Sequence, residues 1–239
     1  MIQFYAPDIA ESCVLPEGES QHCVKVLRHK EGDTVEVING KGHRFKCRIT
    51  EAHPKHTRVE IIERQNLPPF WGAPIAIAVA PTKHLDRMEW MVEKLTETGF
   101  DRLTPILCRW SERKEIKTER LEKIAVSAMK QSLKATLPQI DEMTPFKRFI
   151  SETKDVAQRF IAHCEADKPR RLLADEYRPG AETIILIGPE GDFSPEEIEL
   201  ALEAGFIPVS LGDARLRTET AALNACQTCH VINMITKSE

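Results

Sequence analysis

The hydrophobic pattern of the chain changes near residue 70. Before that point, short segments in which apolar and polar residues alternate predict half-buried β-strands. These segments cover residues 2–5, 34–38, 45–50 and 59–62. After it, short apolar runs alternate with helical patterns of ten or more residues, which is typical of a mainly parallel α/β sheet with helices on both faces. We therefore predict two domains, residues 1–67 and 75–239, joined by a proline-rich linker at 68–74.

The first domain has the pattern of a small β-barrel with one helix. Residues 39–42 (NGKG) predict a hairpin turn, because Asn and Gly accept the positive φ that such turns require. The helix is expected over residues 20–28, with Ser20 as its N-cap. Its buried positions would be Cys23, Val24 and Leu27. Its outward positions would be Lys25, Arg28 and His29. Such a domain could dock on a nucleic-acid backbone, although Arg28 is equally compatible with an ordinary surface arginine.

The second domain is expected to alternate strands and helices. The predicted strands are 75–80, 103–108, 159–163, 183–187 and 207–211. The predicted helices are 86–98, one that begins at Thr118, 195–205 and 221–236. Asp86 and Glu89 have the spacing of a helix cap, and Gly99 is suited to end that helix.

Residues 183–224 contain two units that each consist of a strand followed by a glycine-bearing loop. The first loop begins with residues 188–191 (GPEG), and Ser194 and Glu197 then have the spacing of a capping box. The second loop is expected over 212–220. Two such loops at the carboxyl ends of neighbouring strands would form a ligand-binding crevice, so we place the active site there.

Composition limits the class of protein. With 239 residues, of which 41% are hydrophobic, the chain can form one large or two modest cores. No apolar run approaches the roughly 20 residues of a membrane helix, and the first residues lack the regions of a signal peptide. We expect a soluble, cytoplasmic protein whose seven cysteines are reduced thiols.

Charge is unevenly distributed. The net charge of −4 argues against a protein that coats nucleic acid over its whole surface. Between residues 41 and 58, however, six basic residues accompany only Glu51. The six are Lys41, Arg44, Lys46, Arg48, Lys55 and Arg58. This segment is compatible with a phosphate-binding face, but a solvated strand face balanced by acids elsewhere is the more frequent explanation.

Several motifs of common enzymes are missing from the sequence. Without G-x-x-x-x-G-K-[ST] or a G-x-G-x-x-G after a strand, an ATPase or nicotinamide dehydrogenase would lack its phosphate-binding loop. There is no H-E-x-x-H for a metal centre and no G-x-S-x-G for a hydrolase. Residues 226–230 (CQTCH) match a haem-attachment motif, but they lie within a helical pattern and predict a buried helix face. We expect no metal.

Two motifs give a more specific indication. Residues 187–191 (IGPEG) and 211–221 (LGDARLRTETA) resemble, in order and spacing, the paired motifs of the RsmE family. This family comprises the SPOUT-class methyltransferases of uracil N3 in small-subunit ribosomal RNA. Other segments are similar to family positions: 26–28 (VLR), 86–89 (DRME), 93–99 (EKLTETG) and 131–132 (QS).

The resemblance implies a fold and a cofactor. The fold would be a PUA-like β-barrel followed by a SPOUT domain, whose mainly parallel sheet ends in a C-terminal trefoil knot. The cofactor would be S-adenosyl-L-methionine, and the protein a homodimer. The implied cofactor-binding residues are Leu186, Ile187, Gly188, Pro189, Glu190, Gly191, Leu211, Gly212, Leu216, Thr218, Thr220 and Ala221. The apolar pattern of the last helix is compatible with burial against a partner subunit.

The implied reaction assigns roles to two residues. Uracil N3 carries a proton and must lose it before it can be methylated, so Glu219 is a candidate base. Arg217 could stabilise the charge that develops on the flanking carbonyl oxygens. Alternatively, Arg217 and Glu219 pair with each other or with the partner subunit. The target uridine must be unstacked before N3 can be reached.

The implied substrate is 16S ribosomal RNA, either free or within the small subunit. The candidate RNA-binding residues are Lys25, Arg28, Arg44, Lys46, Lys83 and Lys134. Two positions depart from the family pattern. Asp192 stands where relatives often have glycine, which should matter little to the fold, and residues 133–134 (LK) stand where many relatives carry arginine. Lys134 could still contact a phosphate there, without bidentate geometry.

Two other functions are compatible with the same fold. A non-catalytic RNA-binding factor in ribosome assembly would keep the fold without the reaction, although the intact glycine loops and residues 216–220 (LRTET) argue against it. A SPOUT-class tRNA ribose methyltransferase would be an enzyme of another specificity. The LRTET segment and the preceding barrel favour the uracil enzyme.

Overall fold

The computed structural model describes residues 2–165 and 169–236, which form two compact units. The first unit contains the chain up to Phe70 together with residues 125–137. The second unit contains residues 71–124 and the chain from Pro138 onward. None of the helices in the described part of the chain is long and apolar enough to cross a membrane.

The first unit is built on a four-stranded sheet in the order β1-β2-β3-β4. Its strands are β1 (Gln3–Tyr5), β2 (Thr34–Ile38), β3 (His43–Glu51) and β4 (Arg58–Asn66). Its helical segments are α1 (Ile9–Ser12), α2 (Glu17–Gln21) and the π-helical turn η1 (His22–Val26). The predicted turn between β2 and β3 is confirmed, since the Asn39 side chain accepts hydrogen bonds from the amides of Lys41 and His43.

The predicted N-cap role of Ser20 is wrong. The helical segment begins earlier, at Glu17, so that Ser20 lies inside α2 and is fully buried. Its hydroxyl donates to the Leu15 carbonyl and accepts from the Thr57 amide, both at 2.9 Å. The side chain therefore connects α2 to two loops, a role that depends on residues distant in the sequence.

The second unit contains a sheet of eight strands, and every strand pair in it is parallel, as predicted. The main order is β10-β12-β9-β11-β5-β6-β7, and β8 pairs with β6. The strands are β5 (Ile75–Val79), β6 (Arg102–Leu107), β7 (Gln139–Ile140), β8 (Thr144–Pro145), β9 (Gln158–Ala162), β10 (Arg171–Leu172), β11 (Thr183–Ile187) and β12 (Ile207–Ser210).

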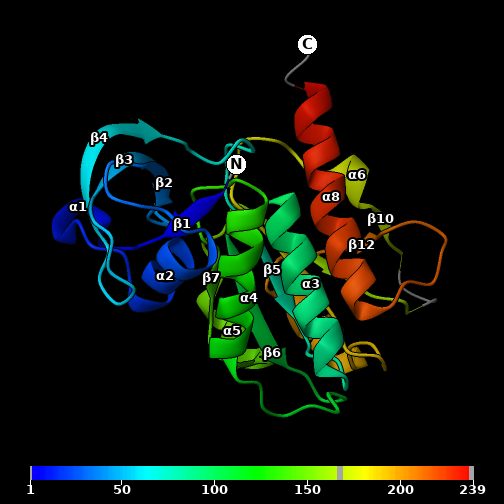
Figure 1. Cartoon of the computed structure of the whole chain (residues 1–239). Coiled ribbons are helices and arrows are strands. Elements are labelled where there is room, and N and C mark those ends of the chain that lie inside the picture. Colours follow the sequence, from blue (N-terminus) through cyan, green and yellow to red (C-terminus); the bar gives the residue numbers. More distant parts are fainter. Residues whose placement is uncertain (1, 166–168, 237–239) are drawn as a thin grey trace. The chain divides into compact units, whose positions relative to one another are not determined.

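Helices cover the sheet of the second unit on both faces (Figure 1). They are α3 (Leu85–Thr98), α5 (Phe146–Glu152), α6 (Leu173–Glu176), α7 (Pro195–Glu203) and α8 (Thr218–Thr236). Helix α4 (Thr118–Gln131) begins in this unit, and its residues from Ala125 belong to the first. On one face, Ala78 and Leu186 of the central strands share a buried cluster with Phe149 of α5 and Ile198 of α7. On the other, α8 packs against α3, β5 and β11.

The order of the strands corrects the prediction that β11 and β12 are neighbours. Strand β9 lies between them and pairs in parallel with both. The two glycine-bearing loops are therefore separated at the sheet edge by the residues that follow β9. Those residues, Cys164 and Arg170 among them, consequently enter the site that the loops form.

Helix ends follow the predicted chemistry in some places and not in others. The capping box of α7 is confirmed by reciprocal hydrogen bonds between Ser194 and Glu197. Gly99 ends α3 with a φ of 110°. The cap at Asp86 is wrong, because α3 begins at Leu85 and Glu89 instead accepts a hydrogen bond from Arg120.

The CQTCH segment of α8 is a buried helix face, as predicted. Cys226 and Cys229 are fully buried, and burial raises the pKa of the Cys229 thiol to about 12. The Cys226 thiol donates to the Gly99 carbonyl, and His230 Nε2 lies 2.6 Å from the same oxygen. In the part of the chain that the structure describes, no group of three His, Cys, Asp or Glu side chains is placed to hold a metal ion.

Trp71, which lies in the predicted linker, is buried in the second unit and closes over Gly99. Its indole Nε1 donates to Asp101 Oδ2 at 2.7 Å. A Cβ atom on residue 99 would lie only 2.4 Å from the indole ring. Gly99→Ala should therefore lower the free energy of unfolding by about 3 kcal/mol, from this collision and the strained φ together.

Urea denaturation measures that effect. Gly180→Ala is the matched control, because Gly180 has a φ of 87° and no neighbour within 4 Å of an added Cβ. Gly180→Ala should therefore lower the free energy of unfolding only by the contribution of the strained φ. Equal changes of the denaturation midpoint in both variants would contradict the role assigned to Trp71.

Candidate functional site

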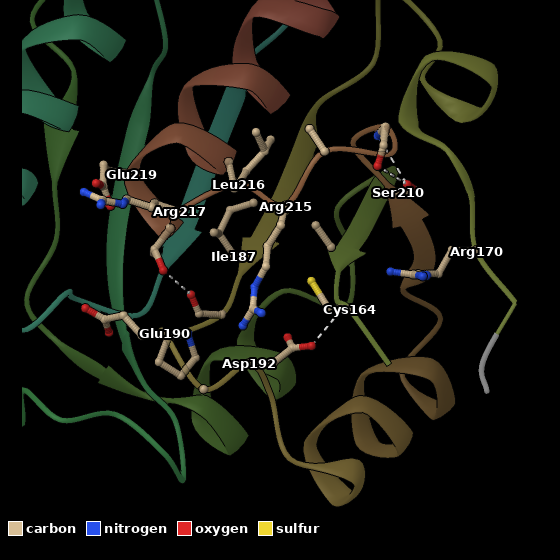
Figure 2. A pocket seen from close by; sticks show the side chains of 18 of the residues that line it. Cys164, Arg170, Ile187, Glu190, Asp192, Ser210, Arg215, Leu216, Arg217 and Glu219 are labelled. Carbon is tan, nitrogen blue, oxygen red and sulfur yellow. Dashed lines mark hydrogen bonds between the residues drawn. The ribbon is translucent and has the colours of Figure 1, made fainter. Parts of the chain in front are cut away.

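A pocket of about 1110 Å³ opens at the carboxyl ends of β9, β11 and β12 (Figure 2). Two segments form most of its wall: the residues after β11, here called the 188–192 loop, and those after β12, here called the 211–217 loop. Ile187, Leu216 and Ala221 give it apolar surface. Arginine and acidic side chains surround this surface, so the pocket can hold a ligand that has both an apolar and a charged part.

Hydrogen bonds hold the two loops together. Thr218, the first residue of α8, donates through Oγ1 to the Gly188 carbonyl at 3.1 Å. Glu190 Oε1 accepts from the Lys83 amide at 3.0 Å, which ties the 188–192 loop to the segment after β5. Gly188 leaves little room for a side chain, because an added Cβ would lie 3.1 Å from the Phe193 ring. These contacts connect the parts of the pocket wall to one another.

Asp192 adopts a φ of 66°, a conformation that favours glycine. Its carboxylate offsets that cost by accepting two backbone hydrogen bonds. The Cys164 amide donates to Oδ2 at 2.6 Å, and the Phe193 amide donates to Oδ1 at 2.8 Å. Asp192 therefore keeps the turn and also connects it to the chain that leaves β9.

The structure brings most of the predicted cofactor-binding residues to this pocket. Those that line it are Ile187, Gly188, Pro189, Glu190, Gly191, Gly212, Leu216, Thr218 and Ala221. Leu186, Leu211 and Thr220 are not among the described residues that line it. Leu186 is fully buried in the sheet and packs on the side of α5 and α7.

Glu219 lies in the first turn of α8, and it is only 7% exposed. Its Oε1 is 3.8 Å from Nε of Arg87, which comes from α3. Its Oε2 is buried and has no hydrogen-bond partner among the described residues. A buried carboxylate oxygen without a donor is costly, so a ligand N–H group that reached it would be stabilised.

Arg217 lines the same side of the pocket, where it is exposed (Figure 2). Its guanidinium group forms no hydrogen bond or ion pair with any residue that the structure describes, so Glu219 pairs with Arg87 and not with Arg217. Sequence reasoning did not place Arg87 in the site. The only signal was its position in the DRME segment, directly after the loop that follows β5.

None of the predicted RNA-binding residues is among the described residues that line the pocket. Lys25, Arg28, Arg44, Lys46 and Lys134 belong to the first unit, and Lys83 belongs to the second. Lys25, Arg28 and Lys46 are exposed. Arg44 is partly buried and donates to the Leu133 carbonyl at 3.2 Å. Lys83 pairs with Glu112 at 3.0 Å.

The local excess of basic residues is partly balanced by acids on neighbouring strands. Arg48 pairs with Glu60 at 3.5 Å, and Arg58 pairs with Glu51 at 3.2 Å. These are exposed pairs of small energetic value. Lys46, which is also exposed on β3, precedes both pairs and belongs to neither.

Comparison with known proteins agrees with this arrangement. Residues 71–230 match the family described as RNA methyltransferase domain, and residues 15–62 match the RNA methyltransferase PUA domain. A ribosomal RNA small subunit methyltransferase E of Aquifex aeolicus is 30% identical over 88% of this chain and 90% of its own.

Solved structures give the same result. The crystal structure of a probable rRNA methyltransferase from Porphyromonas gingivalis is 48% identical, with a TM-score of 0.94 over 99% of this chain and 100% of that one. The ribosomal RNA small subunit methyltransferase E of Neisseria gonorrhoeae, bound to S-adenosyl methionine, is 25% identical. Its TM-score is 0.85 over 97% of this chain and 98% of that one.

The parallel sheet, its loop-built pocket and the PUA domain before it define an RNA methyltransferase. Relatives that align with most of the chain identify the family within this class. The chain belongs to the RsmE family, the ribosomal RNA small subunit methyltransferases E, which confirms the resemblance of the two motifs.

Proposed function

We propose that this protein transfers the methyl group of S-adenosylmethionine to N3 of a uridine in 16S ribosomal RNA. The observation that carries the proposal is the pocket between the 188–192 and 211–217 loops, in a chain of the RsmE family. A relative of the same fold is described as bound to S-adenosyl methionine. That relative's name also gives small-subunit ribosomal RNA as the substrate class.

The pocket has the properties that this cofactor requires. Its volume of about 1110 Å³ lies at the upper end of ligand sites and leaves room for a base beside the cofactor. Ile187, Leu216 and Ala221 offer apolar surface to an adenine ring, and the glycines of both loops let backbone groups approach closely. When bound, the cofactor supplies an electrophilic methyl group.

Two residues of the chain would act on the uracil. Glu219 is proposed to accept the N3 proton through Oε2, the oxygen that has no hydrogen-bond partner among the described residues. Arg217 is proposed to donate to a uracil carbonyl oxygen, where negative charge develops as the proton leaves. Arg87 would hold Glu219 by its ion pair.

The protein is further proposed to be a homodimer with a knotted C-terminal segment. Val231 and Ile235, near the end of α8, are exposed apolar side chains, which supports burial against a second copy of the chain in a homodimer. A trefoil knot in the C-terminal segment is proposed because the chain belongs to the RsmE family. The site of action would be the cytoplasm, and the protein would need no metal.

The RNA would bind in part through the first unit, with Arg28 as the main candidate. Arg28 adopts a φ of 61°, a left-handed conformation that costs an ordinary residue about 1 kcal/mol or more. Its side chain is exposed beside His29 and Lys30, at a hollow of about 510 Å³. The left-handed conformation is that of a residue just after a helix end, where the His29 amide donates to the Cys23 carbonyl, so the proposal rests on the exposed charge of Arg28 beside Lys30.

Arg28→Gly should therefore weaken RNA binding. It should also make the plot of log binding constant against log salt concentration less steep by about one, because one phosphate contact is lost. Thermal stability should stay the same or rise, since glycine accepts the left-handed conformation. Cys13→Gly is the matched control, because Cys13 has a φ of 51° and is not among the candidate RNA-binding residues. An unaltered salt slope in Arg28→Gly would make Arg28 a surface residue without an RNA contact.

The function is tested by incubating the protein with labelled S-adenosylmethionine and 16S ribosomal RNA, both free and within the small subunit. Nucleoside mass spectrometry should detect 3-methyluridine. A ribose-methylated nucleoside, or label transferred to tRNA, would indicate the other methyltransferase specificity. RNA binding without any methylated product would support a non-catalytic assembly factor.

A further inference from the structure

The charged side chains that line the pocket are not all compensated. The lining includes four arginines and four acids. The arginines are Arg87, Arg170, Arg215 and Arg217. The acids are Glu190, Asp192, Asp213 and Glu219. Arg87 pairs with Glu219, and Arg170 Nη1 donates to the His163 carbonyl at 2.5 Å. Within the described ranges, Arg215 has neither a hydrogen bond nor an ion pair, although it was not among the predicted site residues.

Arg215 is directed into the pocket. Its side chain extends from the 211–217 loop toward Asp192 on the opposite wall (Figure 2). No ion pair or hydrogen bond joins Arg215 to Asp192, whose carboxylate oxygens accept backbone hydrogen bonds from Cys164 and from Phe193. Asp213, on the same loop as Arg215, is exposed and forms no ion pair with it.

A guanidinium group in this position is a receptor for a pair of anionic oxygens. Its planar fork matches a carboxylate or a phosphodiester and binds either by two parallel hydrogen bonds. The cofactor's methionine part carries a carboxylate, and the RNA carries phosphodiesters. Arg215 points inward, toward the 188–192 loop, which favours the carboxylate of a ligand held inside the pocket over a phosphodiester of RNA outside it.

We propose that Arg215 binds the carboxylate of S-adenosylmethionine and so selects a cofactor that has an intact amino-acid part. The inference rests on the proposed function, since that function supplies the ligand. It adds a residue whose role is ligand selection and not transfer of the methyl group.

Isothermal titration calorimetry provides the test, with two ligands. S-adenosylmethionine carries the carboxylate, whereas 5′-methylthioadenosine keeps the adenosine and the sulfur but lacks the amino-acid part. Arg215→Gln should weaken S-adenosylmethionine binding roughly ten- to hundredfold, and Arg215→Lys less, because lysine keeps the charge without the fork. Both variants should bind 5′-methylthioadenosine as tightly as the unmodified protein.

Arg148→Gln controls for the loss of one positive charge, because Arg148 pairs with Glu152 on α5, away from the pocket. Equal binding of S-adenosylmethionine by Arg215→Gln and the unmodified protein would overturn the inference, as would an equal loss with both ligands. Weaker binding of a 16S ribosomal RNA fragment alone would assign Arg215 to a phosphodiester instead. If the unmodified protein binds S-adenosylmethionine but methylates no RNA, the proposed function fails while the carboxylate contact stands.

Discussion

Arg217→Ala is expected to abolish methyl transfer while cofactor affinity stays within a few-fold of that of the unmodified protein. The uracil carbonyls gain negative charge only as the N3 proton leaves, so a donor placed there stabilises the transition state more than the bound substrate. Removal of one such donor costs about 10²–10³ in turnover. The Arg217 side chain is free to make this contact, because its guanidinium group has no hydrogen bond or ion pair with the residues that the structure describes.

Single-turnover methylation and calorimetry separate the two parts of that expectation. The rate should fall at saturating cofactor and RNA, whereas the dissociation constant for S-adenosylmethionine should barely change. Arg217→Lys should recover part of the rate, because it retains a cation without the planar guanidinium. Unchanged turnover in Arg217→Ala would remove Arg217 from the mechanism, and a large loss of cofactor affinity would make it a cofactor-binding residue.

The elements around this site show what the sequence could reveal. Strand β11 coincides with its predicted range, since a β-branched run is bounded directly by Gly188 and Pro189. The capping box at Ser194 could be predicted as well, because both of its partners lie within one helical turn. In these places the forces that decide the structure act between residues that are close in sequence.

Contacts between residues that are far apart in the sequence could not be predicted in the same way. The insertion of β9 between β11 and β12 depends on pairing of Phe160 with both strands, and no local pattern encodes that order. The start of α8 was predicted three residues too late, at Ala221 instead of Thr218. In the structure, Glu219 is buried against a cation from another helix.

The residues of the candidate site show the same contrast between local and distant interactions. Gly188 and Gly212 were found because glycine loops after strands have a recognisable composition. Arg87 and Arg215 were not found, because each owes its role to what surrounds it in space: an acid from α8 for Arg87, and the lack of a partner among the described residues for Arg215. Sequence motifs thus predicted where the pocket lies, whereas the positions of its charged side chains are known only from the structure.

The distribution of charge around Glu219 gives the other large expected effect. Glu219→Gln should lower the rate of methyl transfer by about 10²–10⁴-fold, because an amide cannot accept the N3 proton. The shape of the side chain is preserved, so the packing around the start of α8 should be retained. Thermal denaturation checks that expectation, and calorimetry with S-adenosylmethionine checks that the pocket still forms.

Arg87 should act on the rate only through Glu219. Arg87→Met leaves the buried Glu219 carboxylate without the cation that holds it in position. In a double-mutant cycle, Arg87→Met should slow the unmodified enzyme but change the Glu219→Gln variant by less than about twofold, with an interaction energy of about 1–3 kcal/mol. Arg120→Met is the matched control, since it removes an arginine that pairs with Glu89, a residue that does not line the pocket.

Additive losses in that cycle would contradict the coupling, because they would mean that Arg87 contributes independently of Glu219. If Glu219→Gln keeps most of its activity, the N3 proton must leave by another route, such as a water molecule. Arg87 and Glu219 would then be a structural pair that fixes the first turn of α8 against α3, and Arg217 would remain the residue on which the chemistry depends.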